Sequence, residues 1–163
     1  MRTKSLFRSP LGELTLVAEE GALAGLYLPE HRHAPSLDLP PGPPPPGLVE
    51  QLEEWFAGTR RSFDVPLRVS GTPFQREVWD ALATIPYGET WSYAKLAAAI
   101  GRPRAVRAVG LANGRNPVSV VVPCHRVVGA DGALTGYGGG LAAKEWLLAH
   151  EAGSGAWSNA SRS

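Results

Sequence analysis

The segment that most limits how this chain can fold is a run of valines that ends in a proline. Residues 118–128 read Val-Ser-Val-Val-Val-Pro-Cys-His-Arg-Val-Val, and Cys124 is the only cysteine in the sequence. Branched side chains favour a buried strand because they pack well on a pleated surface. Pro123 lacks a backbone N–H, so the strand must end there or move to a sheet edge. The pattern predicts a buried strand over 118–122 and a turn that exposes Cys124.

Two interpretations of Cys124 follow from this position. A rigid strand followed by an exposed turn is a good scaffold for a reactive thiol. A lone cysteine in an apolar segment is also commonly an inert, buried hydrophobic residue. Residues 118–128 by themselves leave both interpretations open.

Length and composition restrict the class of protein. At 163 residues the chain is long enough for one large domain or two small ones. It has no apolar run of membrane-spanning length, and its N-terminus lacks the apolar core of a signal peptide. One cysteine cannot form a disulfide within the chain or a cysteine-rich zinc site. We therefore expect an intracellular protein, cytoplasmic or associated with the nucleoid, that does not bind a membrane.

Positive charge is concentrated in residues 90–130. This segment contains no Asp or Glu, although the net charge of the whole chain is only +1. Such a segment is typical of a surface that binds phosphate or nucleic acid, but a solvated face can have the same composition. Its cations are Lys95, Arg102, Arg104, Arg107, Arg115 and Arg126.

The N-terminal part has the pattern of a small antiparallel sheet followed by a helix. Short apolar-mixed segments are separated by turns that contain Gly and Pro. These segments are 5–8, 13–18 and 22–28. Residues 29–47 lose this pattern and include a proline-rich stretch, which we interpret as a surface linker rather than a ligand for an SH3-like domain. Residues 48–57 have the apolar spacing of a helix that Gly58 ends.

The C-terminal part is predicted to be mainly helical. Thr72-Pro73-Phe74-Gln75 has the residue types of a capping box with proline at the first helical position, so a helix should run from Pro73 to Ile85. Two short helices at 93–100 and 103–112, joined by a tight turn, match a helix-turn-helix. A glycine-rich loop at 129–140 and a last helix at 144–150 complete this part.

The predicted fold class is α+β. A boundary near Gly71 separates a small N-terminal domain over 1–70, with an antiparallel sheet plus helix, from a mainly helical C-terminal domain over 71–151. The C-terminal domain carries the helix-turn-helix and the strand and turn around Cys124. Residues 152–163 are polar and are expected to be a disordered tail.

Several segments of the chain together match the motifs of one known family. They are Gly71-Thr72-Pro73-Phe74-Gln75, Ser92-Tyr93, Arg107-Ala108-Val109-Gly110, Asn116-Pro117, Val122-Pro123-Cys124-His125-Arg126-Val127, Tyr137, Gly139-Gly140-Leu141 and Lys144-Glu145-Trp146-Leu147-Leu148. In their order and spacing, and in the similarity of residues 122–127 to an active-site signature, the chain resembles the O6-alkylguanine-DNA alkyltransferases, also called methylated-DNA–protein-cysteine methyltransferases. The match is close over 71–151, whereas 1–70 are similar only in layout to the family's RNase H-like support domain. This resemblance favours the reactive interpretation of Cys124.

The resemblance implies one irreversible reaction. Cys124, as a thiolate, would attack the alkyl carbon on guanine O6 and keep the alkyl group as a thioether, so each molecule would react once. His125 would accept the thiol proton through a water, because neighbouring side chains in extended backbone point apart. Glu151 would orient the imidazole, Tyr93 would donate to guanine N3, and Asn116 would fix the loop before the cysteine. O4-alkylthymine is a second candidate substrate.

The resemblance also implies how DNA is bound. The damaged nucleotide must leave the base stack before its alkyl carbon can be attacked. The second helix of the helix-turn-helix would enter the minor groove, and Arg107 would fill the space that the nucleotide leaves. Small residues at Ala105, Ala108 and Gly110 would let that helix lie close in the groove. The further positions implied in substrate or DNA binding are Arg126, Val127, Tyr137, Gly138, Gly139 and Lys144.

The implied partner is double-stranded DNA that contains O6-alkylguanine, bound by a monomer with no cofactor and no metal. Two positions depart from common family patterns: Gly138, where many relatives have serine, and Ser119, where animal members have proline. A non-reactive alkylated-DNA binding protein and a helix-turn-helix regulator are the alternatives. The first class lacks the cysteine that is present here, and the second leaves the Cys-His pair unexplained. A cysteine hydrolase would need a histidine elsewhere, and His31, His33 and His150 match no known pattern.

Overall fold

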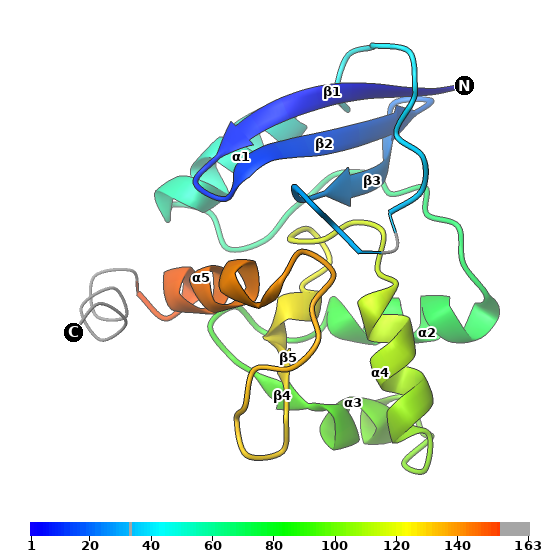
Figure 1. Cartoon of the computed structure of the whole chain (residues 1–163), viewed down its shortest axis with the longest axis vertical. Helices are drawn as coiled ribbons and strands as arrows, with labels where there is room; N and C mark the ends of the chain where they lie inside the picture. Colours follow the sequence, from blue (N-terminus) through cyan, green and yellow to red (C-terminus); the bar gives the residue numbers. More distant parts are fainter. Residues whose placement is uncertain (33, 154–163) are drawn as a thin grey trace.

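The computed structural model describes residues 1–32 and 34–153 (Figure 1). β1 (Arg2–Ser9), β2 (Gly12–Glu19) and β3 (Ala22–Tyr27) form an antiparallel sheet in the order β1-β2-β3. α1 (Leu48–Ala57) follows the proline-rich segment and ends at Gly58, which has a left-handed backbone (φ 85°). The predicted N-terminal sheet and helix are confirmed, and β1 begins three residues before its predicted start.

One hydrophobic core joins the sheet to the helical part of the chain. Leu16 of β2 and Trp55 of α1 belong to the same buried cluster as Leu82 of α2 (Pro73–Leu82). The helices are tied together in turn, because the Trp79 indole N–H of α2 donates to the Ala112 carbonyl of α4 (Val106–Gly114) at 2.9 Å. The two parts of the chain therefore meet through buried apolar side chains.

α2 begins at the predicted capping box but ends earlier than predicted. The Thr72 hydroxyl accepts from the Gln75 N–H at 3.1 Å, and the Gln75 side-chain oxygen accepts from the Thr72 N–H at 3.0 Å. The helix stops at Leu82, and the Ile85 N–H donates to the Leu82 carbonyl in a tighter turn. Pro86 follows, and the residue before a proline is disfavoured in the α conformation.

The predicted helix-turn-helix is present as α3 (Tyr93–Ala99) and α4. The Ser92 hydroxyl caps α3 by accepting from the Lys95 N–H at 3.0 Å. The prediction that the second helix opens at Pro103 was wrong. Residues 102–105 form a turn, closed by the Ala105 N–H on the Arg102 carbonyl at 2.9 Å, and Ala105 is the N-cap of α4.

Residues 118–122 do not form the predicted strand. The Val122 N–H donates to the Val118 carbonyl at 2.9 Å, so the segment turns back on itself. Val120 lies in the left-handed region with φ 74°, which is rare and strained for a branched residue. Val118, Val120 and Val122 are nevertheless buried, and Val121 is partly buried. The apolar pattern correctly predicted that this segment is buried. Its backbone, however, forms a compact loop between the sheet and the helices and not a strand.

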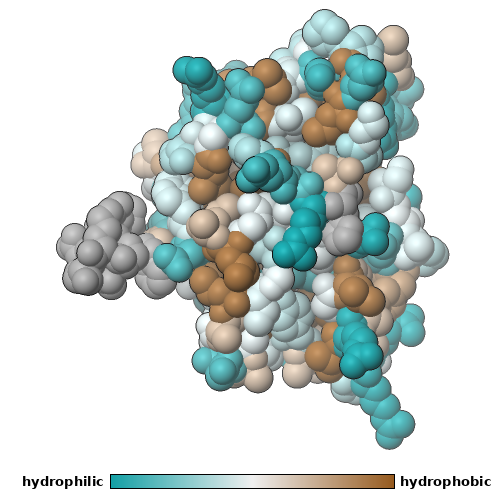
Figure 2. All heavy atoms as spheres, in the orientation of Figure 1, coloured by the Kyte–Doolittle hydropathy of each residue, from teal (hydrophilic) through white to brown (hydrophobic). Residues whose placement is uncertain are grey.

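The remaining elements follow this loop. β4 (Trp91–Ser92) and β5 (Val127–Val128) pair in parallel, and α5 (Leu141–Glu151) extends beyond the predicted 144–150. In the part of the chain that the structure describes, no helix is long and apolar enough to cross a membrane. On the face drawn in Figure 2, hydrophobic residues form small separate patches. From residue 154 onward, the predicted tail lies outside the described residues.

Candidate active site

Cys124 opens η1 (Cys124–Arg126), one turn of 3-10 helix between the 118–122 loop and β5. Its side chain is buried, with only 3% of the residue exposed, so the prediction of an exposed thiol was wrong. Burial raises the pKa of the thiol and outweighs the side chains of Asn116 and Ser119 and the charge of Lys144, which act in the opposite direction. The thiol is therefore protonated at rest, and a base is needed to form the thiolate, which is the nucleophilic form.

Asn116 holds the loop that precedes Cys124. Its side-chain N–H donates to the Val122 carbonyl at 2.8 Å, and its side-chain oxygen accepts from the Val118 N–H at 3.1 Å. The amide thus connects both ends of the turned segment and is itself buried. These are the contacts that the predicted role of Asn116 requires.

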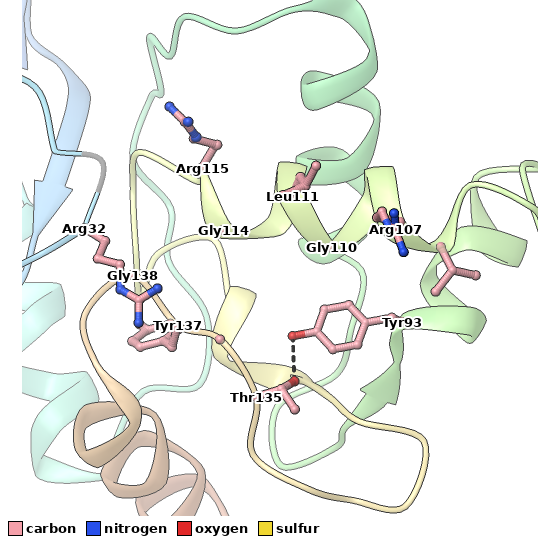
Figure 3. A pocket seen from close by; sticks show the side chains of 12 residues that line it. Arg32, Tyr93, Arg107, Gly110, Leu111, Gly114, Arg115, Thr135, Tyr137 and Gly138 are labelled. Atoms are coloured by element: carbon pink, nitrogen blue, oxygen red, sulfur yellow. Dashed lines mark hydrogen bonds between the residues drawn. The ribbon is translucent and has the colours of Figure 1, made fainter.

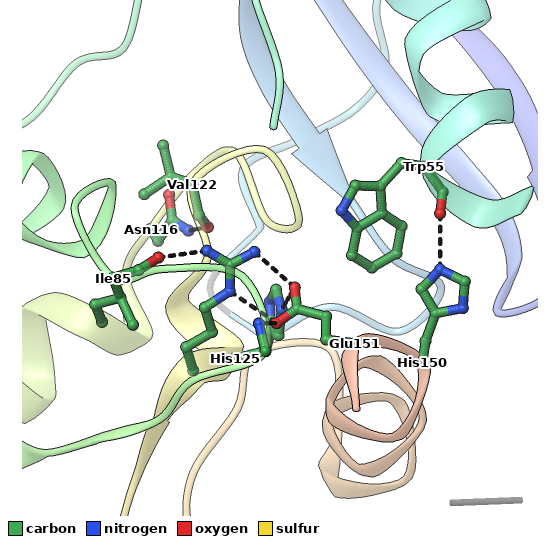
Figure 4. Close-up of polar contacts among 9 residues, drawn as sticks. Trp55, Ile85, Asn116, Val122, His125, His150 and Glu151 are labelled. Carbon is green, nitrogen blue, oxygen red and sulfur yellow. Dashed lines mark hydrogen bonds and ion pairs between the residues drawn. The ribbon is translucent and has the colours of Figure 1, made fainter. Parts of the chain in front are cut away.

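His125, Arg126 and Glu151 form a buried network. Figure 4 labels His125 and Glu151 in it. Glu151 Oε2 lies 2.7 Å from His125 Nε2 and accepts from Arg126 Nη2 at 2.7 Å. Glu151 Oε1 accepts from Arg126 Nε at 2.8 Å and from the Gly88 N–H at 3.2 Å. The short helix η1 and the end of α5 therefore bring together residues that lie 25 and 26 positions apart.

The backbone of Cys124 and His125 is helical, so the argument that extended neighbours point apart does not apply to them. The orientation of the imidazole follows instead from its contact with Glu151. His125 Nδ1 is buried and has no hydrogen-bond partner among the described residues. With Nε2 held by the carboxylate, Nδ1 is the ring nitrogen that remains to accept a proton.

Within this network, the pKa values of His125 and Glu151 are both lowered, with different consequences for their charge. Burial lowers the pKa of His125, and the nearby Arg126 adds to this effect against the opposing carboxylate. Burial alone would raise the pKa of Glu151, but the hydrogen bonds and charges of His125 and Arg126 outweigh it and lower the pKa to about 2. Near neutral pH the carboxylate is therefore ionised and the imidazole is neutral, which is the state of a general base.

Acid is expected to destabilise the fold through Glu151. Its carboxyl group has a pKa of about 2 in the folded protein, against an ordinary value of 4.5. As the pH falls through this window, the unfolded chain binds a proton that the folded chain does not, so stability is lost; above it, the contribution is complete. A shift of this size corresponds to about 3 kcal/mol. Urea unfolding across this pH window should show a larger loss in the wild type than in Glu151→Gln, and equal pH profiles would contradict the assignment.

Arg126 does not belong to a basic surface. It is 6% exposed, and besides Glu151 it donates to the Ile85 carbonyl, while its guanidinium lies 5.5 Å from the centre of the Tyr87 ring. The prediction of a DNA or substrate contact was therefore wrong for this side chain. A buried carboxylate needs a counter-charge and hydrogen bonds, and Arg126 supplies both to Glu151.

A cavity of about 710 Å³ lies between α4 and the glycine-rich loop (Figure 3). Tyr93 and Thr135 are both part of its lining, and the Tyr93 hydroxyl accepts from the Thr135 hydroxyl at 3.0 Å. Tyr137 also lines the cavity, and burial together with the neighbouring Cys124 thiolate raises its pKa well above the ordinary value. Tyr137 therefore connects the cavity to the thiol. The other residues that line it are Arg32, Val106, Arg107, Gly110, Leu111, Gly114, Arg115, Gly136 and Gly138.

Lys144 fastens the glycine-rich loop to α5. Its Nζ donates to the Thr135 carbonyl at 2.6 Å, and the residue is fully buried. Burial lowers the pKa of Lys144 to about 8, against an opposing effect of the Cys124 thiolate. This cation is thus both a tether for the cavity wall and a nearby positive charge for the sulfur.

Of the other residues predicted to bind substrate or DNA, some line the cavity and others lie near it. Arg107 and Ala108 are exposed on α4, whereas Ala105 is partly buried at its start. Gly110 and Gly138 line the cavity; Val127 is buried in β5. A Cβ atom on Gly139 would lie 2.8 Å from Leu28 Cδ2, so this glycine permits a close approach of the N-terminal part.

Sequence reasoning missed Arg32 and Thr135 as lining residues. Leu111 lies on the helix that was predicted to enter the minor groove, one turn after Arg107, but its 70% exposure is visible only in the structure. No local pattern identifies Arg32. Among the described residues, no group of three or more His, Cys, Asp or Glu side chains could hold a metal ion.

Comparisons with known proteins show which family has this sequence and fold. The model of the "6-O-methylguanine DNA methyltransferase, ribonuclease-like domain" matches residues 3–69, and that of the "6-O-methylguanine DNA methyltransferase, DNA binding domain" matches 73–153. A methylated-DNA–protein-cysteine methyltransferase of Mycolicibacterium paratuberculosis is 53% identical over 145 residues, 88% of each chain. Its counterpart in Methanosarcina acetivorans is 46% identical over 154 residues, which cover 88% of this chain and 94% of the relative.

The fold is also similar to that of a solved relative. The crystal structure of Mycobacterium tuberculosis OGT in complex with DNA superposes with a TM-score of 0.88 and 50% sequence identity, covering 91% of this chain and 92% of that one. The family resemblance and the α+β fold inferred from the sequence are thereby confirmed. The chain belongs to the 6-O-methylguanine DNA methyltransferase family.

Proposed function

We propose that this protein repairs DNA by moving the alkyl group of O6-methylguanine, or of a related O6-alkylguanine or O4-alkylthymine, onto Cys124. The observation that carries this proposal is the placement of the cysteine. The thiol lies beside a histidine held by a buried carboxylate, and a lining residue of a basic cavity interacts with it. Membership of the family supports the same chemistry.

The reaction begins with removal of the thiol proton. His125 Nδ1 accepts this proton through a water molecule, and Glu151 stabilises the imidazolium that forms. The Cys124 thiolate then attacks the alkyl carbon, the new S–C bond forms as the C–O6 bond breaks, and the electron pair of that bond stays on guanine. Because a thioether does not release its alkyl group, each protein molecule reacts once and no cofactor takes part.

The departing guanine needs a proton to compensate its negative charge. The Tyr93 hydroxyl lies in the cavity, and it donates to guanine N3 as the C–O6 bond breaks. The Gly138 backbone N–H points to O6, and the carbonyls of Cys124 and Val127 accept from the exocyclic amine. These contacts distinguish guanine from adenine, which lacks that amine.

DNA is held by the helix-turn-helix. A nucleotide must rotate out of the duplex to enter the cavity, and α4 carries the exposed residues Arg107 and Leu111 in the cavity lining. α4 lies in the minor groove with Arg107 in the space left by the nucleotide. The protein acts as a monomer on double-stranded DNA, in the cytoplasm or on the nucleoid, and its binding is weakly specific and sensitive to salt.

Mass spectrometry tests the proposed transfer. Incubation with duplex DNA that contains O6-methylguanine should add one methylene, about 14 Da, to the peptide with Cys124. The same duplex with unmodified guanine is the control and should add nothing. An unchanged mass with tight binding of the lesion would indicate a non-reactive lesion-binding protein. Sequence-selective binding without preference for the lesion would indicate a regulator.

Arg107→Ala is expected to slow repair of duplex DNA by roughly 10- to 100-fold, because extrusion of a base costs a few kcal/mol and Arg107 offsets part of that cost. The reaction with free O6-benzylguanine, which needs no extrusion, should stay near the wild-type rate. Single-turnover rates on the two substrates make the comparison. An equal loss on both would show that Arg107 supports the fold of the site and does not stabilise the extruded state.

A further inference from the structure

Arg32 is the one residue from the N-terminal sheet domain among the described residues that line the cavity. All the other lining residues come from the helix-turn-helix region and the glycine-rich loop. Arg32 lies in the segment that follows β3, which ends at Tyr27. A side chain from the supporting domain therefore reaches the place where the DNA substrate is proposed to bind.

Direct contacts between the two domains position Arg32. Its backbone N–H donates to the Gly138 carbonyl at 2.7 Å. The neighbouring His31 packs so closely that a Cβ atom on Gly138 would lie 2.5 Å from His31 Nε2, and a Cβ on Gly139 would lie 2.8 Å from Leu28 Cδ2. The segment 28–32 is thus seated on the two glycines of the active-site loop, and a side chain at either glycine would push it away.

The charge around the cavity is not neutralised. Arg32, Arg107 and Arg115 line it, and no acidic residue is among the described lining residues. None of these three guanidinium groups forms an ion pair or a side-chain hydrogen bond within the described part of the chain. By contrast, Arg2, Arg60, Arg68, Arg102 and Arg126 each pair with a glutamate. Unpaired cations gathered at one opening repel one another unless an anion binds there.

We propose that Arg32 binds a backbone phosphate of the damaged DNA strand next to the extruded nucleotide, so that the N-terminal domain forms part of the DNA interface. This inference rests on the proposed function, in which a DNA strand crosses the opening of the cavity. A nucleotide that enters the cavity carries its two flanking phosphates to the rim, and a guanidinium can bind a phosphate through paired hydrogen bonds. Figure 3 shows Arg32 and Arg115 on one side of the cavity, with Tyr93 and Arg107 on the other.

Arg32 therefore has a role distinct from that of Arg107. Arg107 occupies the gap in the duplex, whereas Arg32 holds the strand on the opposite rim together with Arg115. A phosphate contact carries no sequence information and adds affinity for any DNA that bends into the cavity.

The test compares Arg32→Gln with Arg8→Gln, which removes an exposed arginine of the same domain that does not line the cavity. Binding of each variant to an O6-methylguanine duplex is measured by fluorescence anisotropy over a series of salt concentrations. Loss of one phosphate contact should reduce the slope of log K against log salt by about 0.9, and affinity at moderate salt should fall roughly threefold to tenfold. Arg8→Gln should change neither, and Arg32→Lys should restore most of the slope.

The same variants are then assayed for single-turnover transfer from free O6-benzylguanine, which has no phosphate. Arg32→Gln should react at the wild-type rate. A slope and an affinity equal to those of Arg8→Gln would overturn the proposal. A matching loss of reaction with the free base would also overturn it, because Arg32 would then act through the Gly138 loop. Absence of transfer in the wild type would refute the proposed function, while the salt slopes would still report the phosphate contact.

Discussion

Cys124→Ser is expected to abolish alkyl transfer while leaving the fold and the binding of damaged DNA in place. A serine hydroxyl is far less acidic than a thiol, so at neutral pH it supplies almost no anionic nucleophile to attack an sp³ carbon. Removal of an enzyme's nucleophile typically lowers the rate by on the order of 10⁶-fold, which leaves no measurable product here. The mass of the variant should stay unchanged after prolonged incubation with O6-methylguanine DNA.

The fold is expected to survive this change because the two side chains are similar in size and the site already contains polar groups, namely Asn116 and Ser119. The thermal midpoint and the affinity for the lesion duplex serve as controls. A variant that binds the lesion and still gains a methyl group would show that another residue accepts it. A variant that has lost binding as well would leave the role of the nucleophile to be tested by Cys124→Ala.

Glu151→Gln is expected to damage both stability and reaction. The substitution leaves Arg126 buried without its counter-charge, and breaking a buried ion pair on one side costs about 3–5 kcal/mol. It also removes the anion that orients His125 through Nε2 and stabilises its charged form, so transfer should slow by at least about 100-fold. Urea denaturation and single-turnover kinetics measure the two effects.

Two further variants separate these effects. Glu145→Gln changes an exposed glutamate on the same helix and should alter neither stability nor rate. The double variant Arg126→Leu with Glu151→Gln removes the unpaired buried charge, so stability should recover in part while transfer stays slow. If transfer recovers together with stability, Glu151 supports only the fold, and its proposed action on His125 is wrong.

Elements with local signals were predictable from the sequence. The capping box at Thr72 and Gln75 places the start of α2, and Gly58 marks the end of α1. In both cases the stabilising groups lie within a few residues of each other, so the free energy that selects the structure is local. The alternating apolar segments and short turns in the N-terminal part are also local signals, and they predicted its strands.

Residues 118–122 show where such reasoning fails. Their branched side chains predicted a strand, yet Val120 takes a left-handed backbone and Asn116 satisfies the ends of a compact loop. A strand needs a partner strand to pair its backbone groups, and the sequence of the segment does not state whether one is present. The buried side-chain amide of Asn116 forms hydrogen bonds with the backbone of Val118 and Val122, and these bonds stabilise a loop in place of a strand.

The sequence by itself determined the chemistry of this protein: a single cysteine followed by a histidine, a basic helix-turn-helix, and the motif order of a DNA alkyltransferase. Only the tertiary structure decided which of these groups act together. Glu151 reaches His125 from 26 residues away, Arg126 turns inward to neutralise that carboxylate, and Arg32 reaches the cavity from the other domain. Local patterns record the preferences of neighbouring residues, whereas the pairing of buried charges depends on which distant segments exclude water together.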